Sequence, residues 1–518
     1  MIFRIFPVFP DLSGFVSSVL FFLLPYPSSR FFSAMSTTVA GVSESASPIP
    51  PKSKSLFEKW IGSWRLQREL FDFYIPIAIA SASQSLTYPL VSSIVSHGCH
   101  LPLESGGFDG ALEFAAFSQG QALMFLLGAL GIGLGTSGMV FAKSRTGQRN
   151  YERLTSILTV ITAVLQILCC VPPFDRLVFG TILGLSPELL EISRNTTLLS
   201  VPMQWMFYSR SKYLPALYLA KKSNLANRAT LYRIGLTALL SPVFNFFGLV
   251  GYVWGAVAMT TGVWVELALT RAYSKPLREA LEDAPELEKA SVMRQFLFML
   301  PLSFGGILLS MTGFLIAIFL AKAPDPTVAL SIHYILMGFI NPFGFAALRT
   351  STVTICFPPE KYGRRPVTVF SLLVGLACCS FSFFMQIPAL SRWYFGSVQN
   401  LSPELVKLAT FAALVVAPIP VVQALRGNAE GLAANRRRPN AIMASQAVFL
   451  SVLAISLFTL TAHPHLVPGY LIGAVSLFLS MIGATLTLYV ALIANDLADQ
   501  YNIAANEHSR GAPTGVRF

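Results

Sequence analysis

Apolar stretches long enough to cross a lipid bilayer recur along this chain from about residue 71 to about residue 494. A transmembrane helix needs about 20 mostly apolar residues, and this criterion predicts about twelve spans. We place them near residues 71–96, 111–142, 152–172, 187–220, 225–247, 250–272, 292–320, 328–356, 366–388, 403–426, 440–461 and 469–494. Only 12% of the residues are charged, against about 25% in soluble domains. The sequence therefore predicts an all-α, polytopic membrane protein.

Basic residues give the chain its net charge of +12, and they gather in alternate connections between the predicted spans. The rich connections lie at 52–68, 143–149, 221–228, 271–289, 361–365 and 436–438 and in the tail, whereas the other set holds little beyond Arg176, Lys322 and Arg392. By the positive-inside rule the rich set faces the cytoplasm. The charge is thus interpreted as an orientation signal rather than a nucleic-acid surface. Both termini are expected in the cytoplasm, and the identity of the membrane stays open.

The chain contains an internal repeat at an offset of 216 residues (401 − 185), because LSPEL stands at 185–189 and again at 401–405. The same offset, without a gap, pairs Phe141 with Phe357, Arg149 with Arg365, Arg176 with Arg392, Pro202 with Pro418 and Arg210 with Arg426. A slip of two residues then aligns GYVWGAV at 251–257 with GYLIGAV at 469–475. Each half has six spans, an even number. The two six-helix bundles are therefore predicted to sit the same way up, related by a pseudo-twofold axis along the membrane normal.

The repeat predicts the domain organisation. We expect an N-terminal bundle at 71–272, an acidic cytoplasmic linker at 273–291, a C-terminal bundle at 292–494 and a tail at 495–518. The leader at 1–70 is apolar at 15–24, which is too short to span securely, and rich in Ser and Pro at 36–55, which is typical of disorder. The leader is interpreted as a targeting segment, an extra anchor, or sequence upstream of a true start at Met35.

Several of these segments resemble one family of exporters. The run from Gly180 through LSPELLEISRN to AKKSN at 220–224, together with its copy from LSPELVKLATF to GLAANR at 431–436, is similar to the junction of the third and fourth helices in MATE-type exporters. The two GYxxGAV stretches resemble the start of that family's sixth and twelfth helices, and TGQRNYER at 146–153 resembles the loop after its second. The resemblance covers about residues 71–494. It implies membership of the multidrug/oligosaccharidyl-lipid/polysaccharide (MOP) exporter superfamily.

The first span departs from the pattern of many MATE exporters. They carry an acidic residue there for cation coupling, whereas IPIAIASASQSLTYPLVSSIVS at 75–96 has none. This departure argues against drug/cation antiport. The first, fourth and tenth helices look closer to the progressive-ankylosis-like branch, whose members are associated with export of small anions such as pyrophosphate, ATP or citrate.

Polar residues inside the predicted spans are candidates for a substrate cleft. They are Gln84, Tyr88, Gln119, Gln121, His333 and Asn341. In the family that the chain resembles, the first, second, seventh and eighth helices line the cleft, which implies that these residues gather there. Interhelical hydrogen bonding without a role in transport is the alternative for each of them. The segment NPFG at 341–344 is expected to interrupt its helix and free backbone carbonyls near mid-membrane.

Charged residues within the spans are also candidates, because an uncompensated charge in a bilayer is costly. Arg210 and Arg426 are expected near the cytoplasmic face, where they either snorkel to the interface or line a cavity that attracts anions. Arg194 lies towards the outer side and should face protein or water rather than lipid. Arg233 and Glu266 fall at similar depth on the fifth and sixth spans, which predicts a structural ion pair.

Two proline pairs mark the fourth and tenth helices. Pro202 and Pro418 each remove one backbone hydrogen bond and permit a kink, which is either a fixed bend for packing or a hinge for alternating access. Ser-Pro-Glu at 186–188 and 402–404 has the composition of a helix start, with Ser as N-cap and Pro in the first turn. Transport chemistry by these two carboxylates is the alternative.

The sequence contains no P-loop, zinc-protease, nucleophile-elbow or dinucleotide-binding motif, so we expect neither an enzyme nor a cofactor nor a metal site. We predict a secondary exporter or flippase that moves an anionic or phosphate-bearing substrate, either a small molecule or lipid-linked, by alternating access. Coupling to H⁺ or Na⁺ and contact with membrane lipids are expected, nucleic acid is not, and a monomer is anticipated. A cation-coupled multidrug antiporter is the first alternative, and an intramembrane enzyme or scaffold is the second.

Overall fold

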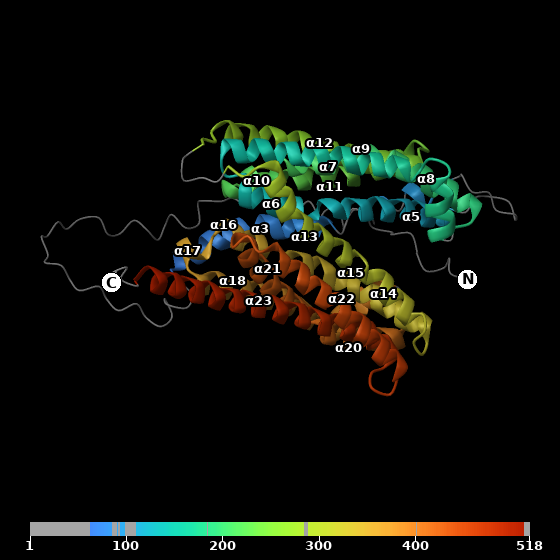
Figure 1. Ribbon diagram of the computed structural model, residues 1–518. Helices are drawn as coiled ribbons and strands as arrows, with labels where there is room; N and C mark the ends of the chain where they lie inside the picture. Colours follow the sequence, from blue (N-terminus) through green and yellow to red (C-terminus); the bar gives the residue numbers. More distant parts are fainter. Residues whose placement is uncertain are drawn as a thin grey trace, which may run out of the picture.

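The computed structural model describes residues 63–84, 91, 94–98, 110–183, 185–283, 289–399 and 401–511. The leader up to residue 62 and the cleft candidate Tyr88 lie outside the described residues. Within the described residues every regular element is a helix. The helices form two halves (Figure 1).

The first half runs from α3 to α12. Its elements are α3 (Trp64–Gln84), α5 (Gly110–Gly128), η2 (Ala129–Gly131), α6 (Ile132–Phe141), α7 (Arg145–Leu168), η3 (Arg176–Ile182), α8 (Pro187–Leu199), α9 (Val201–Ser211), α10 (Leu214–Leu219), α11 (Ser223–Phe246) and α12 (Tyr252–Glu279). Most of these helices make up the upper bundle of Figure 1.

The second half runs from α13 to α23 and forms the lower bundle. Its elements are α13 (Val292–Ser310), α14 (Thr312–Leu320), α15 (Pro326–Leu348), α16 (Thr350–Cys356), α17 (Pro359–Tyr362), α18 (Arg364–Phe384), α19 (Pro388–Ser391), η4 (Arg392–Val398), α20 (Pro403–Val416), α21 (Ile419–Asn435), α22 (Pro439–Ala462), η5 (Gly469–Leu471) and α23 (Ile472–Gly511).

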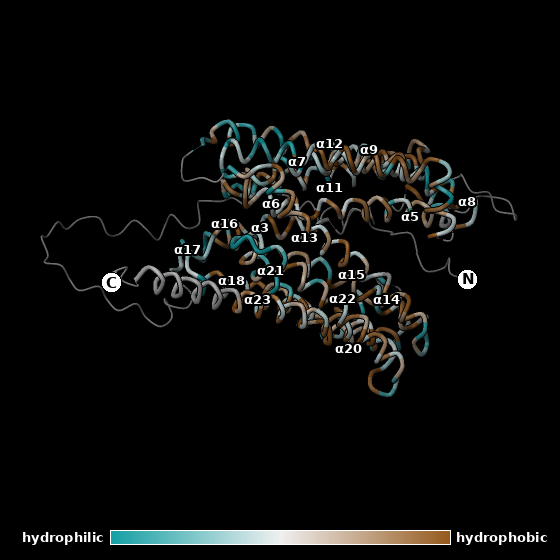
Figure 2. Tube along the Cα trace, in the orientation of Figure 1, coloured by the Kyte–Doolittle hydropathy of each residue, from teal (hydrophilic) through white to brown (hydrophobic). Residues whose placement is uncertain are grey.

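Nine helical stretches among the described residues are long and apolar enough to cross a membrane. The three other predicted spans correspond to α3, to the broken series α8 to α10, and to α11. Brown, apolar residues dominate the long helices, and polar residues gather towards the end of the molecule that carries α16 and α17 (Figure 2). On α7, large apolar side chains such as Ile157, Val160 and Val164 are exposed. Such a surface suits lipid rather than water.

The internal repeat is visible in the backbone. Two seven-residue π-helices, η3 and η4, begin at Arg176 and Arg392, which is the offset of 216 found in the sequence. The two helix starts also match, because α8 begins at Pro187 after Ser186 and α20 at Pro403 after Ser402. The side chain of Ser402 accepts a hydrogen bond from the Leu405 backbone N–H, as expected of an N-cap.

The first helix of each half packs between the halves. The helix α3 lies against α11 of its own half and α15 of the other, and α13 lies against α22 of its own half and α6 of the other. The halves also meet through α6, α10, α16 and α21. We call this end, which carries α10, α16 and α17, the closed end. From it the two halves diverge towards α8 and α20 (Figure 1).

The structure corrects one expectation, because residues 341–344 do not interrupt their helix. The helix α15 continues through Pro342 to Leu348, so the proline removes only one hydrogen bond from it. Gly344 serves packing instead, since a Cβ there would overlap the Gln423 side chain of α21. The chain breaks at Arg349, between α15 and α16.

The fourth and tenth helices break at the predicted prolines. Pro202 lies in the first turn of α9, directly after the end of α8, and Pro418 is the N-cap of α21, directly after the end of α20. Each proline thus begins a new helical segment, where its missing N–H has no intrahelical partner to lose.

Candidate functional site: arginines where the two halves meet

A buried carboxylate of the first half is surrounded by positive charge. Glu266 of α12 is fully buried, and its Oε2 lies 2.7 Å from Arg210 Nη1 of α9 and 3.2 Å from Arg233 Nη1 of α11. The hydroxyl of Thr230 donates a hydrogen bond to Glu266 Oε1 over 2.6 Å. The ion pair predicted between Arg233 and Glu266 is therefore present, and Arg210 joins it. Two cations share one anion, which leaves an excess of one positive charge.

Close packing of α11 against α12 places this cluster. A Cβ at Gly262, one turn before Glu266, would come within 2.6 Å of Thr237 Oγ1 and 3.1 Å of the Arg233 carbonyl oxygen. Glycine is therefore needed at this point for the two helices to approach. The approach brings Arg233 and Glu266 into contact and buries both.

A third arginine stands opposite this cluster, on the second half. Arg349 follows α15, is exposed, and donates a hydrogen bond from Nε to Ser81 Oγ of α3 over 2.7 Å. It lies close enough to Tyr218 of α10 and to Arg210 to interact with them electrostatically. All three of these neighbours belong to the first half. Arg349 therefore places a cation at the boundary that the halves share.

The four charged groups carry an excess of two positive charges, from three guanidinium groups and one carboxylate. Guanidinium groups offer forked N–H donors that match carboxylate and phosphate oxygens. Charges of one sign in a partly enclosed, low-dielectric setting concentrate ions of the opposite sign. Chemically, this arrangement suits an anion that approaches Arg349 from water while Glu266 compensates the charges behind it.

The glutamine candidates of the second span face different surroundings. Gln119 of α5 is exposed, whereas Gln121 is fully buried and donates a hydrogen bond to Ser200 Oγ over 2.8 Å. Gln84 is the last residue of α3. The hydrogen bond of Gln121 joins α5 to the break between α8 and α9, which is an interhelical contact.

The remaining candidates are dispersed through the structure. Arg194 lies 3.2 Å from Asp175, and Arg426 is buried beside Glu430 at 2.9 Å. His333 is buried on α15 next to Gly473, where a Cβ would come within 2.6 Å of His333 Nδ1. Asn341 is half-buried on the same helix.

Of the predicted site residues with described side chains, the structure places only Arg210 in the charged cluster. Arg349 was not among the predicted site residues, although a basic residue inside the predicted span 328–356 was a usable signal. Within the part of the chain that the structure describes, no three His, Cys, Asp or Glu side chains come together as a set of metal ligands.

No protein-family model and no curated protein matches the sequence. Solved structures do match. An outward-facing MATE transporter of the MOP superfamily is 16% identical, with TM-score 0.64 over 84% of this chain and 97% of the other. A variant of the Vibrio cholerae MATE transporter VcmN is 14% identical, with TM-score 0.65 over 83% and 98%. A MOP superfamily transporter from Pyrococcus furiosus, whose pocket has reverse polarity that suggests a different function, is 16% identical, with TM-score 0.60 over 88% and 99%.

These similarities show that the chain has the fold of MATE transporters. Together with the apolar helices, they make it an integral, multi-pass membrane protein. The predicted fold class and the resemblance to the MATE fold are confirmed.

Proposed function

We propose that this chain is a secondary exporter or flippase that moves an anionic or phosphate-bearing substrate by alternating access. The observation that carries the proposal is the position of Arg349, an exposed residue of the second half that hydrogen-bonds Ser81 and interacts electrostatically with Arg210 and Tyr218 of the first half. Arg349 binds the substrate anion, and the Arg210–Glu266–Arg233 cluster supplies the positive background. Arg426 takes no part, because Glu430 neutralises it in the interior.

The charge balance supports an anion over a cationic drug. Glu266, the carboxylate of the charged cluster, is buried and held by two arginines, so it is not available to a cationic substrate. The reversed pocket polarity of the Pyrococcus furiosus transporter indicates that this fold accommodates more than one charge preference. The choice of an anion also agrees with the acid-free first span, in which the sequence looks closer to the progressive-ankylosis-like branch.

The positive-inside rule assigns the two ends of the molecule. The closed end carries Lys221, Arg364 and Arg437 and belongs in the cytoplasm on this rule. Because the halves diverge towards the other end, we propose on this orientation that the arrangement corresponds to an outward-facing state. The breaks at Pro202 and Pro418 are the hinge candidates for the return to an inward-facing state.

Transport into liposomes tests the proposal. The purified protein is reconstituted and offered labelled pyrophosphate, citrate, a cationic dye and a lipid-linked sugar, with empty liposomes as the reference. Movement of at least one of the anionic or phosphate-bearing compounds, and none of the dye, is expected. Proton-driven dye export without movement of any anion would replace this function with multidrug antiport.

A further inference from the structure

Two phenylalanine rings at the closed end each project into the opposite half. The ring of Phe357, from the second half, lies 5.4 Å from the ring of Phe73, and the Lys221 ammonium lies 4.0 Å from its centre. Both contacts come from the first half. The Phe357 side chain is fully buried in this position.

The same arrangement occurs with the halves exchanged. The ring of Phe141, from the first half, lies 5.1 Å from the ring of Phe298, and the Arg437 guanidinium carbon lies 5.5 Å from its centre. Phe298 and Arg437 belong to the second half. Phe141 and Phe357 are 216 residues apart, as are Lys221 and Arg437, so the two contacts are copies related by the internal repeat.

Both cations lie at helix ends with the same unusual backbone conformation. Lys221 and Arg437 have φ angles of 57° and 56°, in the left-handed region that side chains other than glycine rarely adopt. Each follows a helix whose end is closed by matching hydrogen bonds, from Lys222 N to Leu217 O and from Arg438 N to Ala433 O, both 2.8 Å. Glycine is the usual residue at such a helix end. A basic residue stands at this position in both copies, at Lys221 and Arg437. We infer that its side chain has a role that glycine could not fill.

We propose that these two contacts, Lys221–Phe357 and Arg437–Phe141, are paired latches that hold the closed end shut and must both release before that end opens. Each latch joins a cation and a first-helix phenylalanine of one half to a ring of the other. A cation and the face of an aromatic ring attract each other, most strongly where water is excluded. Withdrawal of the ring ends this attraction and exposes both the cation and the ring to water. The proposal rests on alternating access in the proposed function, but not on the nature of the substrate.

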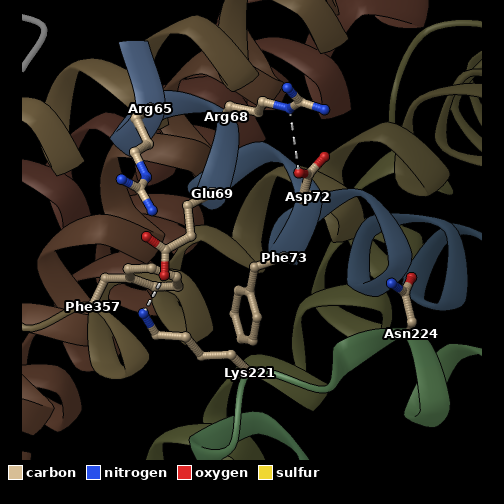
Figure 3. A pocket seen from close by; sticks show the side chains of 8 residues that line it. All are labelled: Arg65, Arg68, Glu69, Asp72, Phe73, Lys221, Asn224 and Phe357. Carbon is tan, nitrogen blue, oxygen red and sulfur yellow. Dashed lines mark hydrogen bonds and ion pairs between the residues drawn. The ribbon is translucent and has the colours of Figure 1, made fainter. Parts of the chain in front are cut away.

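The Lys221 latch has two further partners, one in its own half and one across the boundary. Its ammonium forms an ion pair with Glu69 of α3 and hydrogen-bonds the Tyr362 hydroxyl of the second half over 2.8 Å. Figure 3 shows Lys221 extending beneath Phe357 towards Glu69, at the edge of a cavity of about 560 Å³.

Distance measurements between spin labels test the latches in the full chain. Labels are placed on exposed positions of the two halves at the closed end, at Arg228→Cys and Glu360→Cys, after the native cysteines are replaced. The latch variants are Lys221→Gln, Arg437→Gln and the double variant. The adjacent exposed lysine provides the control Lys222→Gln, and Lys221→Arg keeps the cation.

Each single variant is expected to raise the population with a long distance about five- to tenfold, and the double variant by more than either. Lys222→Gln and Lys221→Arg should stay close to the parent. Phe357→Leu, which retains apolar bulk but removes the ring, should match Lys221→Gln. An unchanged distance distribution in a folded, monodisperse double variant would overturn the latches.

The outcome is separable from that of the transport assay. Longer distances without anion transport keep the latches and reject the proposed substrate. Anion transport with unchanged distances in the double variant keeps the substrate and rejects the latches. Size-exclusion profiles and thermal unfolding show whether each variant is folded before its distances are measured.

Discussion

Arg210 Nη1 lies 2.7 Å from Glu266 Oε2, and this ion pair joins the fourth and sixth helices of the first half in its interior. The sequence predicted only Arg233 as the partner of Glu266. The additional arginine explains how a fully buried carboxylate is retained, since two guanidinium groups and the Thr230 hydroxyl occupy its oxygens.

Replacement of Glu266 should therefore destabilise the protein. Glu266→Gln leaves Arg210 and Arg233 facing each other without an anion, and breaking a buried pair of this kind costs about 3–5 kcal/mol. Thermal unfolding in detergent measures the loss. Glu279→Gln, at the exposed end of the same helix, is the matched control and should change stability by less than about 0.5 kcal/mol. Equal stability of the two variants would contradict the role of Glu266.

Replacement of Arg349 should affect transport more than folding. Arg349→Ala removes the exposed cation and is expected to lower anion transport at least about tenfold, the value of a charge-assisted bond, with little change in unfolding temperature. Arg349→Lys keeps the charge but not the forked donors and should retain intermediate activity. Arg271→Ala, which replaces an exposed arginine in the C-terminal part of α12, is the control. Rates for Arg349→Ala equal to the control's would remove Arg349 from the site.

Two glycines of the first half should respond in opposite ways to alanine. At Gly262 a Cβ has no room against Thr237 and the Arg233 carbonyl, so Gly262→Ala should force α11 and α12 apart and cost about 1–3 kcal/mol. At Gly235 of α11 a Cβ meets nothing within 4 Å, so alanine should gain about 0.5–1 kcal/mol from helix propensity. Unfolding temperatures of the two variants measure the difference. A stable Gly262→Ala protein would argue against close packing at the cluster.

The Lys221 latch should not respond to pH in the neutral range. Burial opposes the charge of Lys221, but the hydrogen bonds to Glu69 and Tyr362 outweigh it and raise the pKa of this loop lysine above its ordinary value. Because the pKa is raised, the stabilisation that the charged Lys221 gives to the latch is complete below the pKa of an unfolded lysine, about 10.4. This stabilisation is lost only at higher pH. Label distances at the closed end should thus be equal at pH 6 and pH 8.5.

A histidine at position 221 should make that latch titratable. In Lys221→His the cation exists only below a pKa of about 6.5, so the long-distance population should increase as the pH rises from 5.5 to 8. The Lys222→His variant has its imidazole beside the latch rather than in it and should show no such change. A pH response in both variants would point to a general effect of histidine at this end.

The twelve-span pattern and the repeat could be predicted because they depend on local and periodic properties. Apolar length determines which segments cross a bilayer, and identical residues at one offset, such as Arg176 and Arg392, reappear as matching π-helices. The helix starts at Pro187 and Pro403 also follow from local capping chemistry. The expected break at 341–344 was wrong, because a proline permits a break without requiring one, and α15 continues through Pro342 to Leu348.

The amino-acid sequence by itself determined that this protein lies in a membrane as two similar helical halves, since hydropathy and repetition are properties of the chain alone. Only the tertiary structure decided that Arg349 lies close enough to Arg210 and Tyr218 to interact with them, and that Lys221 and Arg437 lie over rings of opposite halves. The residues of each contact are far apart in sequence. Whether they meet depends on the orientation of one half relative to the other. Neither helical periodicity nor the distribution of charge along the sequence determines that orientation.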